Sequence, residues 1–158
     1  MSSLYRFSPI QNQKELFAAV AYIAEQTTTL CQKITGERLP IPYLTIFAHY
    51  PDEYDVMRAI VAELGAITEA NNGIAVELDQ PLPAAGQSLT RLRIRRPDPY
   101  RMQVGCNDFD PGDYPTFKQH HLAAHPDNLR LIERPDYEMI EFFDPDFDVL
   151  AYVVSTKL

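Results

Sequence analysis

The most informative segment of the chain is EFFDPDFDVLAYV, residues 141–153. Two apolar runs flank a short acidic segment that contains Pro145. Because proline and aspartate favour turns and the flanking runs favour strands, the stretch predicts a β-hairpin. Asp144, Asp146 and Asp148 alternate as they would in a calcium loop, but no glycine and no glutamate follows at EF-hand spacing. We therefore interpret these aspartates as turn-forming residues.

Working back from the hairpin, two stretches of the chain share one pattern. LTIFAHYPDEY (44–54) and MQVGCNDFDPGDY (102–114) each run from an apolar strand through an acidic, proline-containing turn to a tyrosine on a helix. Each is followed by three more predicted strands, so the order βαβββ occurs twice and indicates an α+β fold. The expected strands are 43–49, 66–70, 74–79 and 88–96, then 101–107, 129–133, 137–143 and 149–155, with helices at 51–64 and 113–124 and a loop at 80–87.

Residues 12–35 read as an amphipathic helix that precedes both repeats. Asn12 and Glu15 form a capping-box pattern, and Gly36 is a stop signal. Apolar residues recur every three or four positions, so the helix has one apolar stripe that must pack on its own sheet or on a partner. Cys31 lies on this stripe, which favours a buried structural thiol.

The hairpin and the repeated order resemble the glyoxalase-like, or vicinal-oxygen-chelate (VOC), family. Its last hairpin usually reads apolar strand, Asp-Pro-Asp-Gly-Asn, an apolar pair and then a metal-binding Glu. Here Asp144-Pro145-Asp146 fits, 147–148 replace the Gly-Asn, and Ala151 stands at the Glu position. The resemblance implies tandem βαβββ modules, about 43–96 and 101–155, that form a curved open barrel around a shared cavity.

That domain, 43–158, would follow a helical extension, 1–42. A tandem α+β barrel of the regulatory, effector-binding type is the alternative fold.

The resemblance also implies where a metal would bind, because the family takes its ligands from the first and last strands of each module. Divalent metals there are held by imidazole or carboxylate groups, and the matching positions supply neither. We therefore expect no catalytic metal and no cofactor in the usual place. The matching positions hold Tyr43 or Thr45, Arg93 or Arg95, Gln103, and Ala151 with Tyr152 beside it.

An arginine-rich segment and the polar strand after it predict a binding surface. Five arginines lie between 91 and 101, and in an acidic chain such a cluster can hold a small anion. The alternative is a solvated strand face paired with carboxylates. Gly105 within the polar strand suggests close approach of a backbone or ligand, whereas Cys106 has the opposite parity and is expected in the core. The predicted ligand-binding residues are Arg93, Arg95, Arg101, Gln103 and Asn107, with Tyr43, Phe47, Phe142 and Tyr152 as apolar walls.

Two residues are candidates for acid–base catalysis. His49 shares a strand face with Thr45 and has a suitable intrinsic pKa; alternatively it ends the strand and caps the next helix. Glu138 is expected to face the cavity; alternatively it is an exposed residue at the start of a strand. His121 and His125, one helical turn apart, could share a metal, but Pro126 favours a solvent-facing helix end.

Composition narrows the classes of function. The net charge is −8, which disfavours nucleic-acid binding. No stretch approaches the length of a membrane span, two cysteines do not support a disulfide scaffold, and the N-terminus lacks an apolar signal core, so we expect a cytoplasmic protein.

Three hypotheses remain. The first is a metal-independent, glyoxalase-like protein that binds an anionic or hydrogen-bonding organic ligand. The second is an enzyme of the same fold, with lyase, isomerase or dioxygenase-like activity. The third is an interaction protein that uses its N-terminal helix, and a homodimer is left open.

Overall fold

The computed structural model describes residues 4–156; the ends of the predicted domain ranges, 1–3 and 157–158, lie outside these residues. Within the described residues, three α-helices and eight β-strands confirm the α+β class. They are α1 (Gln13–Thr35), β1 (Leu44–Phe47), α2 (Pro51–Ala62), β2 (Gly65–Ala70), β3 (Gly73–Ala84), β4 (Gln87–Arg95), β5 (Gly105–Phe109), α3 (Tyr114–His121), β6 (Leu129–Glu133), β7 (Glu138–Phe142) and β8 (Leu150–Val154).

The strands form one mixed sheet in the order β2-β3-β4-β1-β5-β8-β7-β6. In each half of the sheet the first strand pairs in parallel with the last, β1 with β4 and β5 with β8. The halves meet where β1 and β5 pair antiparallel at the centre. This arrangement fits a βαβββ-type fold, and it brings the first strands of both halves together.

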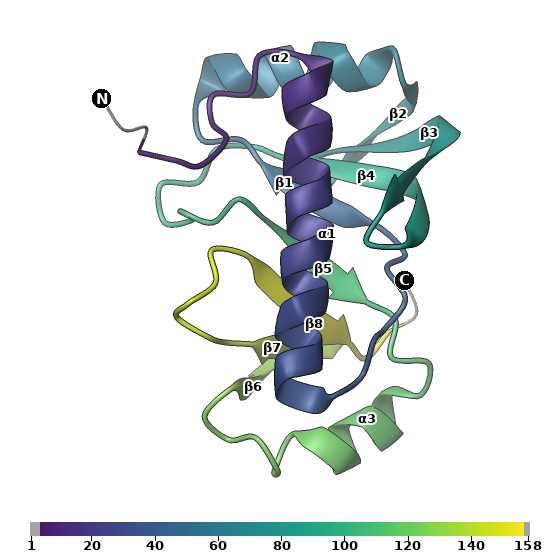
Figure 1. The fold of residues 1–158 in the computed structure, drawn as a ribbon, viewed down its shortest axis with the longest axis vertical. Helices are drawn as coiled ribbons and strands as arrows, with labels where there is room; N and C mark the ends of the chain where they lie inside the picture. The colour runs from purple at the N-terminus through teal and green to yellow at the C-terminus, as the bar shows by residue number, and fades with distance from the viewer. Residues whose placement is uncertain (1–3, 157–158) are drawn as a thin grey trace.

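Helix α1 runs along the length of the molecule in front of the sheet, with α2 near one end and α3 near the other (Figure 1). Asn12 caps its first turn by accepting the backbone N–H of Glu15 at 2.9 Å, and Gly36 ends it with φ +76°. Its apolar stripe joins one hydrophobic cluster with the sheet, so the stripe is covered within the chain. No helix in residues 4–156 combines the length and the apolar character needed to cross a membrane.

The sheet has two chemically different faces. A Cβ placed on Gly105 would lie 2.5 Å from Ile23 of α1, so this position faces the helices. Residues opposite it in neighbouring strands, such as Ile46, share that orientation, which we call the helix face. Their neighbours in sequence, including Thr45 and Arg93, point to the other side, which we call the open face.

Two predicted boundaries are corrected by the structure. The expected loop at 80–87 is mostly strand, because β3 continues through Pro81 and Pro83 after a register shift between Glu77 and Leu82. Strand β2 pairs with β3 only as far as Leu78, so these prolines have a neighbouring strand on one side alone, where proline is tolerated.

The first strand of the second half begins at Gly105 and not at 101. The chain turns before it, with the N–H of Arg101 donating to the carbonyl of Asp98. Val104 is then tied to two different segments, donating to Asp148 and accepting from Phe47. Regular pairing with β1 therefore starts one residue later, at Gly105.

Candidate functional site

A pocket of about 260 Å³ lies on the open face where the two halves meet. Strands β1 and β4 supply one wall, and β5, β8 and the β6–β7 hairpin supply the other. Because alternate residues of a strand point to the same face, β1 contributes Thr45 and Phe47, and β5 contributes Cys106 and Asp108. The residues that line it are Thr45, Phe47, Asn71, Asn72, Arg93, Ile94, Arg95, Arg101, Cys106, Asp108, Arg134, Tyr137, Met139 and Tyr152.

Aromatic rings beneath the arginines of β4 position the guanidinium groups. The guanidinium of Arg93 lies 5.6 Å from the ring centre of Tyr43, and that of Arg95 lies 5.3 Å from the ring centre of Phe47. Such cation–π contacts each contribute about 0.5–2 kcal/mol. Arg93 also donates to the carbonyl of Asn71 at 3.2 Å, and Arg95 forms an ion pair with Asp98 at 3.3 Å. The arginine side chains are thus held at the pocket by several contacts.

Asp108 supplies the negative charge at the pocket. Among the described residues that line it, Asp108 alone is acidic. Its Oδ2 accepts a hydrogen bond from the Tyr43 hydroxyl at 2.9 Å. Burial raises the pKa of Asp108, and this outweighs the opposing effects of the Tyr43 hydrogen bond and of Arg93. Burial and the nearby carboxylate also raise the pKa of Tyr43 to about 12.

The thiol of Cys106 and the phenol of Tyr152 are neutral groups at the pocket. Burial raises the pKa of the Cys106 thiol to about 12, so it is not a thiolate nucleophile at neutral pH. Burial, with a further contribution from Glu141, raises the pKa of Tyr152. Cys106 pairs across the sheet with Thr45, and Tyr152 pairs with Asp108. Cys106, Tyr152 and Tyr43 therefore place a thiol and two hydroxyl groups on the side of the sheet that carries Asp108.

Residues 4–156 contain no group of three or more His, Cys, Asp or Glu side chains arranged to hold a metal ion. Of these four residue types, the pocket lining contains Asp108 and Cys106, and guanidinium groups lie beside them. The positive charge of these guanidinium groups repels a cation and attracts an anion.

The other acidic and histidine clusters make contacts outside the pocket. Asp144 forms an ion pair with Lys33 of α1 at 2.6 Å, and Asp148 accepts the Tyr22 hydroxyl of α1 at 2.5 Å. These contacts fasten the β7–β8 connection to α1. His121 bonds Glu37 through its Nε2. His125 lies beyond the end of α3.

Five of the predicted ligand-binding residues line the pocket: Arg93, Arg95, Arg101, Phe47 and Tyr152. Tyr43 lies next to it, with its hydroxyl on Asp108.

Asn107, Phe142 and Gln103 are placed elsewhere. Asn107 points to the helix face and donates to Thr27 of α1 at 3.1 Å. Phe142 packs on the same face against Phe117 of α3, with ring centres 6.1 Å apart. Gln103 precedes β5, and its carbonyl contacts the His49 ring at 2.9 Å. Along β5 the predicted alternation is correct, but the two faces are exchanged: Asn107 lies on the helix face, and Cys106, which was predicted to lie in the core, lines the pocket.

His49 lies at a different, smaller pocket of about 170 Å³, formed with the N-terminal segment. Its Nδ1 is 2.6 Å from the Ser8 hydroxyl, and its Nε2 is 2.9 Å from the Gln103 carbonyl oxygen. Its ring stacks on Tyr5 with ring centres 4.0 Å apart. Burial lowers the pKa of His49. With both ring nitrogens engaged, His49 is placed as a structural link and not at the pocket on the open face.

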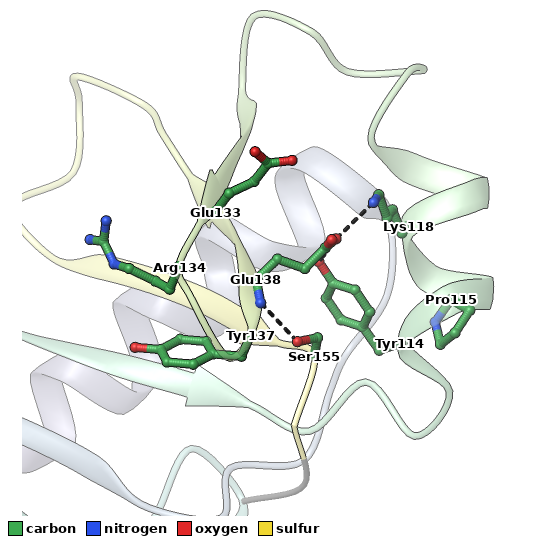
Figure 2. A pocket seen from close by; sticks show the side chains of 8 residues that line it. All are labelled: Tyr114, Pro115, Lys118, Glu133, Arg134, Tyr137, Glu138 and Ser155. Atoms are coloured by element: carbon green, nitrogen blue, oxygen red, sulfur yellow. Dashed lines mark hydrogen bonds and ion pairs between the residues drawn. The ribbon is translucent and has the colours of Figure 1, made fainter.

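Glu138 lies in a third hollow, an open groove of about 610 Å³ between α3 and the β6–β7 hairpin (Figure 2). Its carboxylate forms an ion pair with Lys118 at 2.7 Å and accepts the Tyr114 hydroxyl at 2.8 Å. The Lys118 hydrogen bond is the largest cause of its lowered pKa. Arg134 and Tyr137 line both this groove and the pocket, so the hairpin tip separates the two hollows.

Sequence reasoning missed the most distinctive polar group of the pocket, Asp108. A usable signal was present, because Phe109 of the same strand is strongly apolar and belongs to the helix face. Alternation from Phe109 would have assigned 106 and 108 to the open face. Arg134 and Tyr137 come from a hairpin turn, for which strand parity gives no guidance.

Comparison with known proteins gives a fold and no family. No family model matches the chain, and no curated protein matches it. A structural-genomics structure described as Protein EC4020 superposes with a TM-score of 0.68 at 13% identity, covering 99% of this chain and 93% of its own. At that identity the likeness shows the fold alone. A Bacillus subtilis subsp. subtilis str. 168 protein, provisionally named a dioxygenase, is 17% identical over 73% of this chain and 40% of its own, and its TM-score of 0.27 is too low to support any argument.

Proposed function

We propose that this protein binds a small organic anion in the pocket on the open face, and does so without a metal ion. The observation that carries the proposal is the charge distribution. The chain carries a net charge of −8, yet the pocket is lined by four arginines: Arg93, Arg95, Arg101 and Arg134. Among the described residues that line it, Asp108 is the single acidic one.

The chemistry of arginine supports an anionic ligand. A guanidinium group stays charged at any physiological pH and offers paired N–H donors that match a carboxylate or a phosphate. Here the groups are held over aromatic rings, so less side-chain entropy is lost when a ligand binds. The volume of about 260 Å³ suits a small metabolite and not a nucleotide.

Metal independence is supported by the residue types on the central strands. On the open face, β1 offers Thr45, β4 offers Arg93 and Arg95, and β8 offers Tyr152. Asp108 of β5 provides a carboxylate, but divalent sites usually need three or four such groups. Arginine is a hydrogen-bond donor and not a ligand for a cation.

Thermal unfolding with a panel of carboxylates and phosphate esters tests the proposal. A bound anion at one hundred times its Kd stabilises by about 2.7 kcal/mol, which corresponds to a rise of roughly 5–11 °C in Tm. Arg93→Gln and Arg95→Gln should abolish this rise. Arg58→Gln is the matched control, because Arg58 lies on α2 in an exposed ion pair with Glu69.

The proposal fails if no anion of the panel raises Tm, or if Arg93→Gln responds as the unmodified protein does. Elemental analysis of the same sample addresses the metal. One equivalent of a transition metal, lost together with anion binding in Asp108→Asn, would replace this proposal with a metal-dependent one.

A cytoplasmic location and a homodimer also remain proposals. The first is supported by Cys31 and Cys106, which are both free thiols, as is usual in a reducing compartment. Sedimentation at several protein concentrations would test the second.

A further inference from the structure

We propose that the ligand of this pocket carries a hydroxyl group close to its anionic group, and that Asp108 accepts the hydrogen bond of this hydroxyl. The inference rests on the proposed function and specifies the class of ligand: a hydroxycarboxylate or a hydroxyalkyl phosphate.

The first step of the argument is the state of the Asp108 carboxylate. Its Oδ2 is occupied by the Tyr43 hydroxyl at 2.9 Å. No side chain or backbone N–H of residues 4–156 donates a hydrogen bond to its Oδ1, and Arg93 acts on the carboxylate only through space. Asp108 nevertheless lines the pocket, so this oxygen is available to a bound molecule.

The second step is the free-energy cost of leaving Oδ1 of Asp108 without a hydrogen bond when a ligand binds. In the free protein, water can reach Oδ1 through the open pocket. An anion that has acceptors alone would displace this water without donating a hydrogen bond to Asp108. Binding would then cost the free energy of desolvating a charged group. A hydroxyl restores the lost hydrogen bond without adding charge.

The third step is the choice of a hydroxyl over an ammonium group. The guanidinium groups of Arg93, Arg95, Arg101 and Arg134 outnumber the carboxylate of Asp108 at the pocket. An ammonium group beside Asp108 would be repelled by these neighbours. A neutral donor satisfies Asp108 and leaves the arginines to the anionic group.

The spacing of the two subsites follows from Tyr43. Its hydroxyl lies 3.5 Å from Nη1 of Arg93 and 2.9 Å from Oδ2 of Asp108. The anion site on Arg93 and the hydroxyl site on Asp108 are therefore joined through one phenol oxygen. A hydroxyl one or two carbon atoms from the anionic group can reach both sites.

Matched pairs of probes test the inference by calorimetry and thermal unfolding. Malate and succinate differ by one hydroxyl group, and so do 2-hydroxypropyl phosphate and propyl phosphate. A hydrogen bond to a charged group predicts about tenfold or tighter binding of the hydroxylated member. The pair that shows this preference identifies carboxylate or phosphate as the anionic group.

Variants at position 108 supply the decisive readout. In Asp108→Ala, malate should bind only as tightly as succinate, whereas succinate binding should be retained. Asp108→Asn keeps the side-chain volume, so it serves if the alanine variant does not fold, and it should reduce the preference at least threefold. Asp79→Asn, an exposed aspartate of β3 outside the pocket, is the matched control.

The outcomes separate this inference from the proposed function. Equal binding of both members of each pair, abolished by Arg93→Gln, would overturn the role of Asp108 and leave anion binding intact. A preference that survives in Asp108→Ala would overturn it as well. Binding of none of the four probes would overturn the proposed function and, with it, this inference.

Discussion

Glu53 offers the sharpest test of how the N-terminal segment is attached to the sheet. Its side chain is 2% exposed, and its two oxygens accept backbone hydrogen bonds at 2.6 Å, one from Ile10 and one from His49. Glu53 lies in the first turn of α2 and thus joins the start of that helix to the end of β1 and to the segment before α1. Replacing it by glutamine keeps the volume and removes the charge.

The cost of Glu53→Gln follows from these two bonds. Glutamine has one carbonyl oxygen, so one N–H keeps a neutral acceptor and the other faces an NH₂ donor. Losing one charge-assisted hydrogen bond and weakening another should lower the free energy of unfolding by ~2–4 kcal/mol. For a chain of this length that corresponds to a fall of ~4–16 °C in Tm.

Thermal and urea unfolding, monitored by circular dichroism, measure this loss in the free energy of unfolding. Glu63→Gln, at an exposed position just after α2, is the matched control and should change stability by less than about 0.5 kcal/mol. If Glu53→Gln is as stable as the control, the two short hydrogen bonds do not stabilise the fold and the reasoning is refuted.

Three further predictions concern the central strands and the thiols. Because burial raises the pKa of Asp108, the folded state binds its proton more tightly than the unfolded state does, and stability from this group is lost as pH rises through the folded pKa. Asp108→Asn should therefore raise Tm at neutral pH, with a gain that disappears on acidification; a uniform gain at every pH would contradict this cause. Cys31 is buried and its pKa is raised to about 11, so it should react with a thiol reagent at pH 8 only after unfolding in urea. Cys106 is part-exposed at the pocket and its pKa is raised to about 12, so it should react slowly in the native protein and faster after unfolding. Rapid labelling of the native protein would show that one thiol is more accessible than its surroundings imply. In Gly105→Ala the new Cβ would lie 2.2 Å from the Thr45 carbonyl oxygen, so the free energy of unfolding should fall by about 1–3 kcal/mol. Unchanged urea unfolding would show that β1 and β5 can move apart without loss of stability.

The candidate site illustrates how far sequence patterns reach. Arg93 and Arg95 were predicted to bind an anion, and both line the pocket on the open face. Along β5 the alternation was predicted correctly and the face was not. The strand is short, and its polar residues occur on both faces, so its pattern alone does not say which side is covered. The contact of Gly105 with α1 and the bond from Asn107 to Thr27 decide this in three dimensions.

Features that depend on residues close together in the chain could be predicted from the sequence. Helix α1 begins after Asn12, whose side chain caps it with a hydrogen bond, and ends at Gly36, which adopts a left-handed φ. The acidic segment after Phe142 separates strands β7 and β8. Three features became known from the three-dimensional structure: α1 covers the centre of the sheet, Asp108 lies with the arginines at the pocket, and His49 and Glu138 lie in other hollows. These outcomes depend on contacts between residues far apart in the chain, because the covered face of a strand is set by whatever packs on it and not by the strand's own pattern.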